Sequence, residues 1–509
     1  MRTTAFSGGV VRVDSERLAD WALVEDGVVV AHGSEDAPAA DRVVDLNGGT
    51  LIPAFCDAHV HLPATGLYAS GLDFRGTREA DAILEAFARR ARDATGVLFG
   101  GNFEDPLDRP LDRDELDRAV GERMALLARA DMHSCVVSSA LLERLNLEGS
   151  EGVDRDVDGR PSGYLREAAA AHAWQWFDRN LSRADQQAAV RAATQLAYSK
   201  GLASVHEMFV VEWRGWDSFE VFSEAVKELA LQVVIYCGTP DVERVAALGL
   251  GRIGGDFFLD GSFGSRTAWL SDPYVSTAPS GSAPNGTRYR SDQELFDFFF
   301  AGHEAGLQVG VHAIGDAAIS QAIATWERVA DKVGRESLVA RGHRIEHFEC
   351  ASDDHINRAA ALGLRASIQP VFDAFWGGTE GMYAERIGTE RALQMNRFAS
   401  MLKAGLHIGA GSDSNVTPLD PFLQMRSLRR HHVDEERLSG RDAFAAHTVG
   451  AFALAGTDGG TLDVGRPAHV AWLDRDPVTV DADDLTEVDV LGTWVRGMRV
   501  WPPDEAEAT

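Results

Sequence analysis

The chain has 509 residues, of which 45% are hydrophobic, so it can bury a large core and form two or three structural units. Its 78 acidic side chains outnumber the 49 basic ones, and the formal net charge of -29 argues against nucleic acid or an anionic membrane surface as a partner. The N-terminus lacks the features of a signal peptide, no apolar stretch approaches membrane-spanning length, and the four cysteines form no C-x-x-C pair. These features predict a globular, cytoplasmic enzyme.

Both ends of the chain have the alternating texture of short β-strands. We expect strands at 9–13, 21–25 and 28–31, with a hairpin turn at Asp26-Gly27, and again at 469–473, 488–491 and 493–500. Neither end alone supplies enough strands to close a core. Residues 1–52 and 458–509 are therefore predicted to form one small β-sandwich domain that the chain leaves and re-enters.

Between these ends, over residues 53–457, apolar strands alternate with amphipathic helices. Strands are expected at 51–57, 202–206, 231–237, 256–260, 307–312, 342–347, 364–369 and 406–411, and helices at 184–200, 217–230, 292–305, 316–331, 353–362 and 390–404. Eight strands in this pattern predict an α/β fold, a closed (β/α)8 TIM barrel. The long stretch at about 70–183, after the first barrel strand, predicts an inserted subdomain.

Side chains that bind metals gather at the predicted strand ends. His59 and His61 share one face of the first strand's end, because alternate residues of a strand point the same way. His312, His347 and Asp413 end the fifth, sixth and eighth strands. Reactive groups of a barrel lie at the carboxyl ends of its strands, so we expect these five to meet. Four imidazoles and one carboxylate suit zinc, iron(II) or another borderline divalent metal.

These motifs resemble the amidohydrolase superfamily, and more narrowly its YtcJ-like branch (amidohydrolase family 3), which includes the N-substituted formamide deformylases. The resemblance covers nearly the whole chain and is carried by residues 50–61, 159–167, 260–268, 311–316, 344–347, 367–370 and 411–413. Residues 465–470 are similar to the segment where that family returns to its β-sandwich domain.

The resemblance implies that the five side chains bind metal, and that Asp413 also moves protons. Many relatives carry a carboxylated lysine that bridges two metals at the position where this chain has Asp256. Because an aspartate is shorter and cannot be carboxylated, we expect one firmly bound ion. Zinc is favoured, with iron and manganese as alternatives, and a second ion requires Asp256 or a water as a bridge.

The chemistry follows from these groups. A divalent metal lowers the pKa of a bound water from ~15.7 to about 7, and Asp413 can take the water proton and pass it to the leaving nitrogen. His206, at the predicted end of the second strand, is expected to face the substrate, with a structural role as the alternative. His133 lies in a segment of the insertion that resembles a family segment reaching the pocket. Both are candidates to hold the developing oxyanion, a role worth ~3 to 4 kcal/mol per group.

Several aromatic residues follow predicted barrel strands, which predicts an apolar or aryl wall for the substrate, with core packing as the alternative for each: Trp213, Trp216, Phe372, Phe375 and Trp376.

The sequence thus predicts a metal-dependent hydrolase that cleaves a non-peptide C-N bond, with the amide of a small N-substituted amide or formamide favoured. Deamination of a cyclic amidine or nucleobase-like ring is the alternative that the same ligands support, and the fold cannot choose between the two. A non-catalytic metal-binding regulatory protein is the third hypothesis, against which the complete ligand set argues. The expected partner is a small molecule, with neither nucleic acid nor membrane, and a homo-oligomer is compatible with the sequence.

Overall fold

The structure is a computed structural model that describes residues 3–93, 96–103, 107–129, 134–147, 149–275 and 283–503. Its internal contacts divide the chain into two compact units. The first comprises Met1–His61, Gln195–Val210 and Leu229–Thr509, and the second comprises Leu62–Thr194 and Val211–Glu228. No helix among the described residues has both the length and the apolar character needed to cross a membrane.

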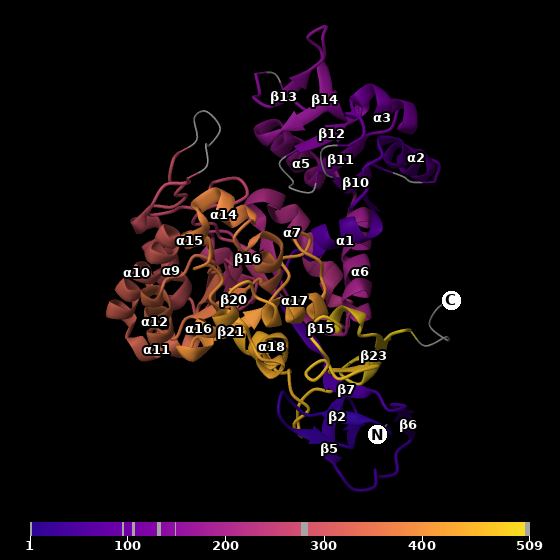
Figure 1. Ribbon diagram of the computed structural model, residues 1–509, viewed down its shortest axis with the longest axis vertical. Helices are drawn as coiled ribbons and strands as arrows, with labels where there is room; N and C mark the ends of the chain where they lie inside the picture. The colour runs from indigo at the N-terminus through magenta and orange to yellow at the C-terminus, as the bar shows by residue number, and fades with distance from the viewer. Residues whose placement is uncertain are drawn as a thin grey trace. The chain divides into compact units, whose positions relative to one another are not determined.

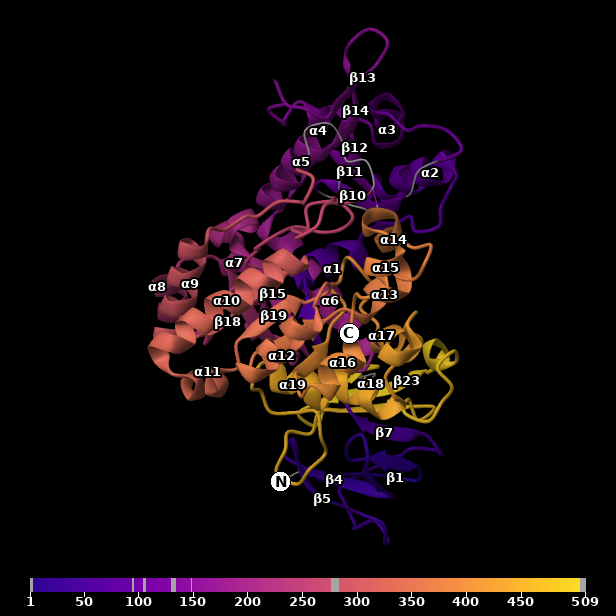
Figure 2. The same cartoon turned by 60° about the vertical axis from the view of Figure 1, so that its left-hand side comes forward.

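In the first unit, strands from both ends of the chain lie in one sheet, and indigo β7 lies on the same side of the unit as yellow β23 (Figures 1 and 2). The six strands have the order β24-β23-β22-β7-β2-β3. Their bounds are β2 (Val10–Arg12), β3 (Leu18–Ala19), β7 (Thr50–Pro53), β22 (Val470–Leu473), β23 (Val490–Val495) and β24 (Met498–Trp501).

A four-stranded sheet of the order β5-β4-β1-β6 comes from the N-terminal residues alone. It contains β1 (Thr3–Ser7), β4 (Trp21–Glu25), β5 (Val28–Gly33) and β6 (Arg42–Asp45). Asp26 and Gly27 join β4 to β5 with φ of 47° and 83°, as the hairpin prediction requires. The rings of Phe6 and Trp494 meet edge to face at 5.2 Å in one buried cluster, so the two ends of the chain share a hydrophobic core.

Eight parallel strands follow in the middle of the chain, in a three-stranded sheet of the order β16-β15-β8 and a five-stranded sheet of the order β17-β18-β19-β20-β21. Their bounds are β8 (Phe55–Val60), β15 (Leu202–Val210), β16 (Gln232–Gly238), β17 (Arg252–Ile253), β18 (Gln308–Ala313), β19 (Arg344–His347), β20 (Arg365–Ile368) and β21 (His407–Ala410). Backbone hydrogen bonds connect the two sheets, from Gly254 N to Cys237 O at 2.9 Å and from Asp413 N to His59 O at 2.8 Å. The carboxyl ends of β8 and β21 are thereby held together.

Of the predicted fourth strand, 256–260, only a single parallel bridge forms, between Phe258 and His312 of β18. The fourth strand is instead β17 and ends at Ile253, because Gly254 and Gly255 follow it with φ of 84° and 71°. A Cβ at Gly254 would lie 2.0 Å from Gly310 O, so the chain needs glycine there. Asp256 consequently lies beyond the strand end.

Two other predicted elements are divided. The strand expected at 51–57 splits at Ala54 into β7 and β8, which belong to different sheets. The helix expected at 390–404 splits into α15 (Thr389–Ala392) and α16 (Phe398–Lys403), because Asn396 has a φ of 54° that a helix cannot accommodate.

Helices pack beside the strands of the first unit. In α10, Ile319, Ile323 and Trp326 form a buried stripe at helical spacing, and this helix packs on β18. The helices are α8 (Val242–Ala247), α9 (Asp292–Glu304), α10 (Asp316–Val333), α11 (Arg335–Arg341), α12 (Asp353–Ala361), α13 (Pro370–Trp376), α14 (Met382–Ile387), α17 (Pro421–Arg429), α18 (Gly440–His447) and α19 (Val449–Leu454), with 3-10 turns η1 (Asp434–Glu436) and η2 (Leu485–Glu487).

The second unit includes the stretch 70–183 that the sequence marks as an insertion. Its sheet has the order β13-β14-β12-β11-β10-β9, with bounds β9 (Leu72–Asp73), β10 (Leu98–Phe103), β11 (Ala125–Arg129), β12 (Ser134–Val137), β13 (Val153–Arg155) and β14 (Pro161–Arg166). Its helices are α1 (Leu62–Ser70), α2 (Ala80–Arg90), α3 (Arg113–Val120), α4 (Ser139–Leu142), α5 (Glu167–Asn180) and α7 (Val211–Lys227), while α6 (Arg183–Ser199) has residues in both units. The unit has its own buried apolar clusters.

Candidate metal centre

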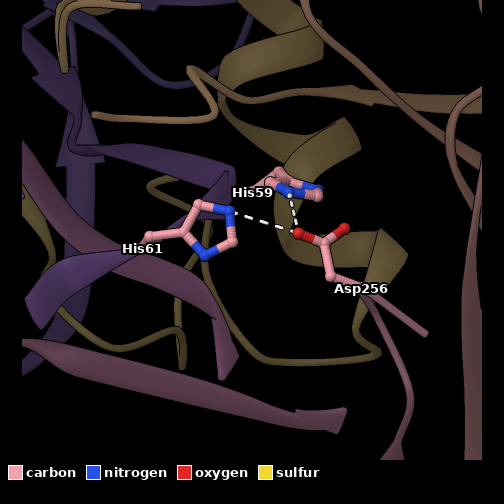
Figure 3. A group of neighbouring side chains, drawn as sticks. All are labelled: His59, His61 and Asp256. Atoms are coloured by element: carbon pink, nitrogen blue, oxygen red, sulfur yellow. Dashed lines mark ion pairs between the residues drawn. The ribbon is translucent and has the colours of Figure 1, made fainter. Parts of the chain in front are cut away.

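The structure brings the predicted ligands of the first strand together with two carboxylates. His61 Nε2 lies 3.2 Å from Asp256 Oδ2 and 3.1 Å from Asp413 Oδ1. His59 Nε2 lies 3.5 Å from the same two oxygens. Figure 3 shows the Asp256 carboxylate facing both rings. The first strand therefore offers two imidazole nitrogens to one point, as its His-x-His spacing predicts.

The other oxygen of Asp256 faces a second pair of histidines. Asp256 Oδ1 lies 3.7 Å from His312 Nδ1 and 3.6 Å from His347 Nε2. Three groups of three potential ligand atoms, each group within 4.8 Å, can be drawn: His59 with His61 and Asp256; Asp256 with His312 and His347; and His59 with His347 and Asp413. Asp256 thus lies between the two pairs of histidines.

Five of the facing atoms are buried and have no hydrogen-bond partner in the part of the chain that the structure describes: His59 Nε2, His312 Nδ1, His347 Nε2, Asp256 Oδ1 and Asp413 Oδ1. A buried polar atom left unsatisfied costs about 1 to 3 kcal/mol, so five such atoms in one cluster indicate that a further binding partner belongs among them. Imidazole nitrogens and carboxylate oxygens are the usual ligands of a divalent transition metal. The residues present therefore fit a metal ion.

The second ring nitrogen of each histidine faces an oxygen that can accept its proton, which leaves the lone pair of the first nitrogen free for a metal. The four contacts are His59 Nδ1 to Glu346 Oε2 (3.1 Å), His61 Nδ1 to Met208 O (3.0 Å), His347 Nδ1 to Gln369 Oε1 (2.8 Å) and His312 Nε2 to Gly261 O (3.3 Å).

The backbone at two of the predicted ligands adopts an uncommon conformation. His347 and Asp413 have φ of 71° and 53°, in the left-handed region, which costs of the order of 1 to 3 kcal/mol for a residue with a side chain. Asp57, which is also buried, accepts hydrogen bonds from His59 N at 3.1 Å and Ser412 N at 3.0 Å. These contacts fix the turn that aims Asp413 at the first strand's histidines.

The two carboxylates keep His61 protonated when no metal is bound. Burial alone would lower the pKa of His61, but the carboxylates of Asp256 and Asp413, 3.2 and 3.1 Å from its Nε2, raise it to about 10. Burial alone would raise the pKa of Asp413, but His59 and His61 hold it below its ordinary value. A metal ion at this point must therefore displace a proton.

We expect zinc binding to release protons at pH 7. The His61 proton persists up to its pKa of about 10, so from about pH 7 to 10 each unit of pH should strengthen zinc binding about tenfold per displaced proton. Calorimetry of zinc binding to the metal-free protein, in buffers that differ in ionisation enthalpy, measures this release. Binding heats that do not change with the buffer would contradict the proton displacement.

His206 does not join this group. It is fully buried, and β15 continues four residues past it to Val210, so it lies within the strand and not at its end. Its Nδ1 lies 2.9 Å from Arg344 Nη1 and its Nε2 lies 3.6 Å from Cys56 Sγ. This placement differs from the expected substrate-facing position. His133, the other predicted oxyanion candidate, lies outside the described residues.

The predicted aromatic wall is divided between the units. Phe372, on α13, lies parallel to the His347 ring with centroids 6.1 Å apart, and Trp376 lies 4.7 Å from Phe372. Phe375 is 53% exposed. Trp213 and Trp216 belong to α7 of the second unit. Phe372 therefore lies beside the predicted ligand His347, and Trp376 packs against Phe372.

Sequence reasoning assigned no role to Glu346, which contacts His59, or to Arg344, which pairs with Glu346 at 2.6 Å. Burial would raise the pKa of Glu346, but the Arg344 charge and the hydrogen bonds from Arg344 and His59 hold it below its ordinary value. The sequence feature that could have revealed Arg344 and Glu346 is their charge, because the other two residues of this buried strand are the apolar Ile345 and the predicted ligand His347.

The cluster suits a metal-dependent enzyme, and the comparisons with known proteins identify its class as a hydrolase that acts on carbon-nitrogen bonds other than peptide bonds. A family model described as "Amidohydrolase family" matches residues 42–501, and the chain belongs to this family.

Individual relatives agree with this assignment and with the resemblance seen in the sequence. The chain is 25% identical to YtcJ of Bacillus subtilis (strain 168), over 94% of this chain and 95% of YtcJ. It is also 25% identical to the N-substituted formamide deformylase of Arthrobacter pascens, over 94% of each chain. The crystal structure of an uncharacterized metal-dependent hydrolase from Pyrococcus furiosus matches with a TM-score of 0.78 and 26% identity, over 94% of this chain and all of that one.

Proposed function

We propose that the protein hydrolyses the amide bond of a small N-substituted amide or formamide, using a divalent metal held by His59, His61, His312, His347, Asp413 and Asp256. The observation that carries this proposal is the convergence of five buried, unsatisfied ligand atoms. The similarity to a formamide deformylase over almost the whole chain favours an N-substituted amide as substrate. Phe372 and Trp376 favour a substrate with an apolar or aryl part.

The fold that would support this site is a closed (β/α)8 barrel over residues 53–457, with the insertion at 70–183 and a β-sandwich built from 1–52 and 458–509. In favour of closure, hydrogen bonds join β8 to the segment after β21, and Gly254 to β16. Metal ligands at the carboxyl ends of the strands agree with the position of active sites in such barrels.

We further propose two ions, with Asp256 between them, in place of the single ion expected from the sequence. Six protein ligands exceed the four that surround one tetrahedral zinc ion. The two oxygens of Asp256 also face different pairs, His59 with His61 and His312 with His347. Zinc is the proposed metal because imidazole nitrogens dominate the donor set, and iron and manganese are the alternatives.

In this proposal a bound divalent ion supplies Lewis acidity and an acidified water. Asp413 is the general base that accepts the water proton, since its Oδ1 lies beside His59 Nε2 and His61 Nε2 and has no other hydrogen-bond partner among the described residues. The same carboxylic acid then protonates the leaving nitrogen. The products are a carboxylic acid, or formate, and a free amine.

Removal of the metal should abolish hydrolysis, and zinc should restore it. The protein is stripped with a chelator, and formanilides, N-acyl amines and cyclic amidines are offered before and after adding zinc, iron(II) or manganese(II). We expect acid and free amine from the first two classes only after metal is added, because the metal supplies the acidified water.

Ammonia from the cyclic amidines alone would replace the proposal with a deaminase. A fully metal-loaded protein that turns over none of these compounds would contradict the proposed substrate class.

A further inference from the structure

We infer that Arg344, Glu346 and His206 form a buried positioning network that determines which nitrogen of His59 faces the metal. The inference rests on the proposed metal centre and extends it to residues behind the ligands. It also gives His206, which does not reach the ligand cluster, a defined task.

Arg344 is completely buried, yet each of its five N–H groups has an acceptor. Nε donates to Glu346 Oε1 at 2.9 Å, and Nη2 donates to Glu346 Oε2 at 2.6 Å and to Ala58 O at 2.8 Å. Nη1 donates to His206 Nδ1 at 2.9 Å and to the Tyr236 hydroxyl at 3.1 Å. Since no donor remains, the guanidinium has one orientation, which a lysine could not reproduce.

This orientation decides the protonation of His59. Arg344 occupies both oxygens of Glu346 from one side, and Glu346 Oε2 also lies 3.1 Å from His59 Nδ1. An ionised carboxylate can only accept, so His59 must carry its proton on Nδ1. The lone pair of Nε2 then points at the proposed metal, beside Asp256 and Asp413.

His206 completes the network from the neighbouring strand. Because a guanidinium has no acceptor, His206 Nδ1 must accept from Arg344, and its proton lies on Nε2, 3.6 Å from Cys56 Sγ. His206 is therefore a neutral hydrogen-bond acceptor that holds Arg344 in place. The Tyr236 ring supports the same guanidinium from 4.5 Å.

The test is the affinity of the metal-free protein for zinc, measured by calorimetry, in the wild type, Arg344→Met and Glu346→Gln. Loss of a group that orients a metal-binding histidine typically weakens metal binding 10- to 100-fold, and we expect a loss in this range for both variants. In the cobalt(II)-loaded protein the visible spectrum should shift, because the His59 ligand changes orientation. His206→Gln, which keeps an acceptor oxygen, should retain tighter binding than His206→Leu.

Arg12→Met is the matched control, because Arg12 is also buried and pairs bidentately with Asp476 at 2.9 and 2.6 Å, in the sheet formed by the chain ends. It should leave zinc affinity unchanged. If Arg344→Met does not fold, the zinc affinity of Glu346→Gln tests the network alone, because this variant keeps the size of the side chain.

Wild-type affinity in Arg344→Met and Glu346→Gln, or an equal loss in Arg12→Met, would overturn the network while leaving the proposed function intact. A wild-type protein that binds no zinc, iron(II) or manganese(II) would overturn both.

Discussion

Asp413→Asn should lower kcat by about 10²- to 10⁴-fold, the usual contribution of a general acid-base group. The asparagine has the same size and still offers a carbonyl oxygen toward His59 and His61, which lie 3.5 and 3.1 Å from Asp413 Oδ1. It cannot take the proton from water or return it to the leaving nitrogen. The rate should therefore fall much further than the metal content.

Both quantities are measurable on one preparation, with kcat on the best amide of the substrate panel and the metal content by mass spectrometry. Asp476→Asn is the matched control, since Asp476 is a partly buried carboxylate that pairs with Arg12 away from the ligands. It should keep the wild-type kcat. Full activity in Asp413→Asn would rule out Asp413 as the proton carrier.

The clustering of the proposed ligands could be predicted from the sequence because each lies at or close to the end of an apolar strand. His59, His61, His312, His347 and Asp413 are far apart in the chain, yet parallel strands carry their carboxyl ends to one side. The family resemblance agreed with the same positions, and the family assignment is confirmed by the match over residues 42–501.

The residues behind the ligands could not be predicted in this way. Arg344 contacts His206 across 138 residues and Ala58 across 286, and no local pattern encodes such pairs. His206 was misplaced because β15 extends to Val210, and an apolar run does not mark where a fully buried strand stops.

Asp256 shows how a local backbone feature changes a chemical expectation. Because an aspartate is shorter than a carboxylated lysine and cannot be carboxylated, the sequence predicts one firmly bound ion. The fourth strand, however, ends at Ile253, and Gly254 and Gly255 turn the chain so that Asp256 itself lies among the ligands. The path of the backbone thus brings the short Asp256 side chain close to both pairs of histidines.

Asp256→Asn should reduce the metal content from two ions per chain to one. The amide keeps one carbonyl oxygen, but its NH₂ group donates and cannot coordinate a cation, so this side chain can offer an oxygen to only one of the two histidine pairs. The affinity for the second ion should fall by about 100-fold or more, beyond the 10- to 100-fold typical of groups behind the ligands. Metal analysis after dialysis at fixed free zinc, with calorimetry for each binding step, measures this loss.

Asp256→Glu is the informative companion variant, because it keeps a carboxylate with two oxygens and should retain more of the second ion than Asp256→Asn. Since an aspartate needs no carboxylation, removing bicarbonate and carbon dioxide should leave the wild-type metal content unchanged. One ion in both the wild type and Asp256→Asn, bound with equal affinity, would show that the four histidines and Asp413 share a single metal and that Asp256 is not its bridge.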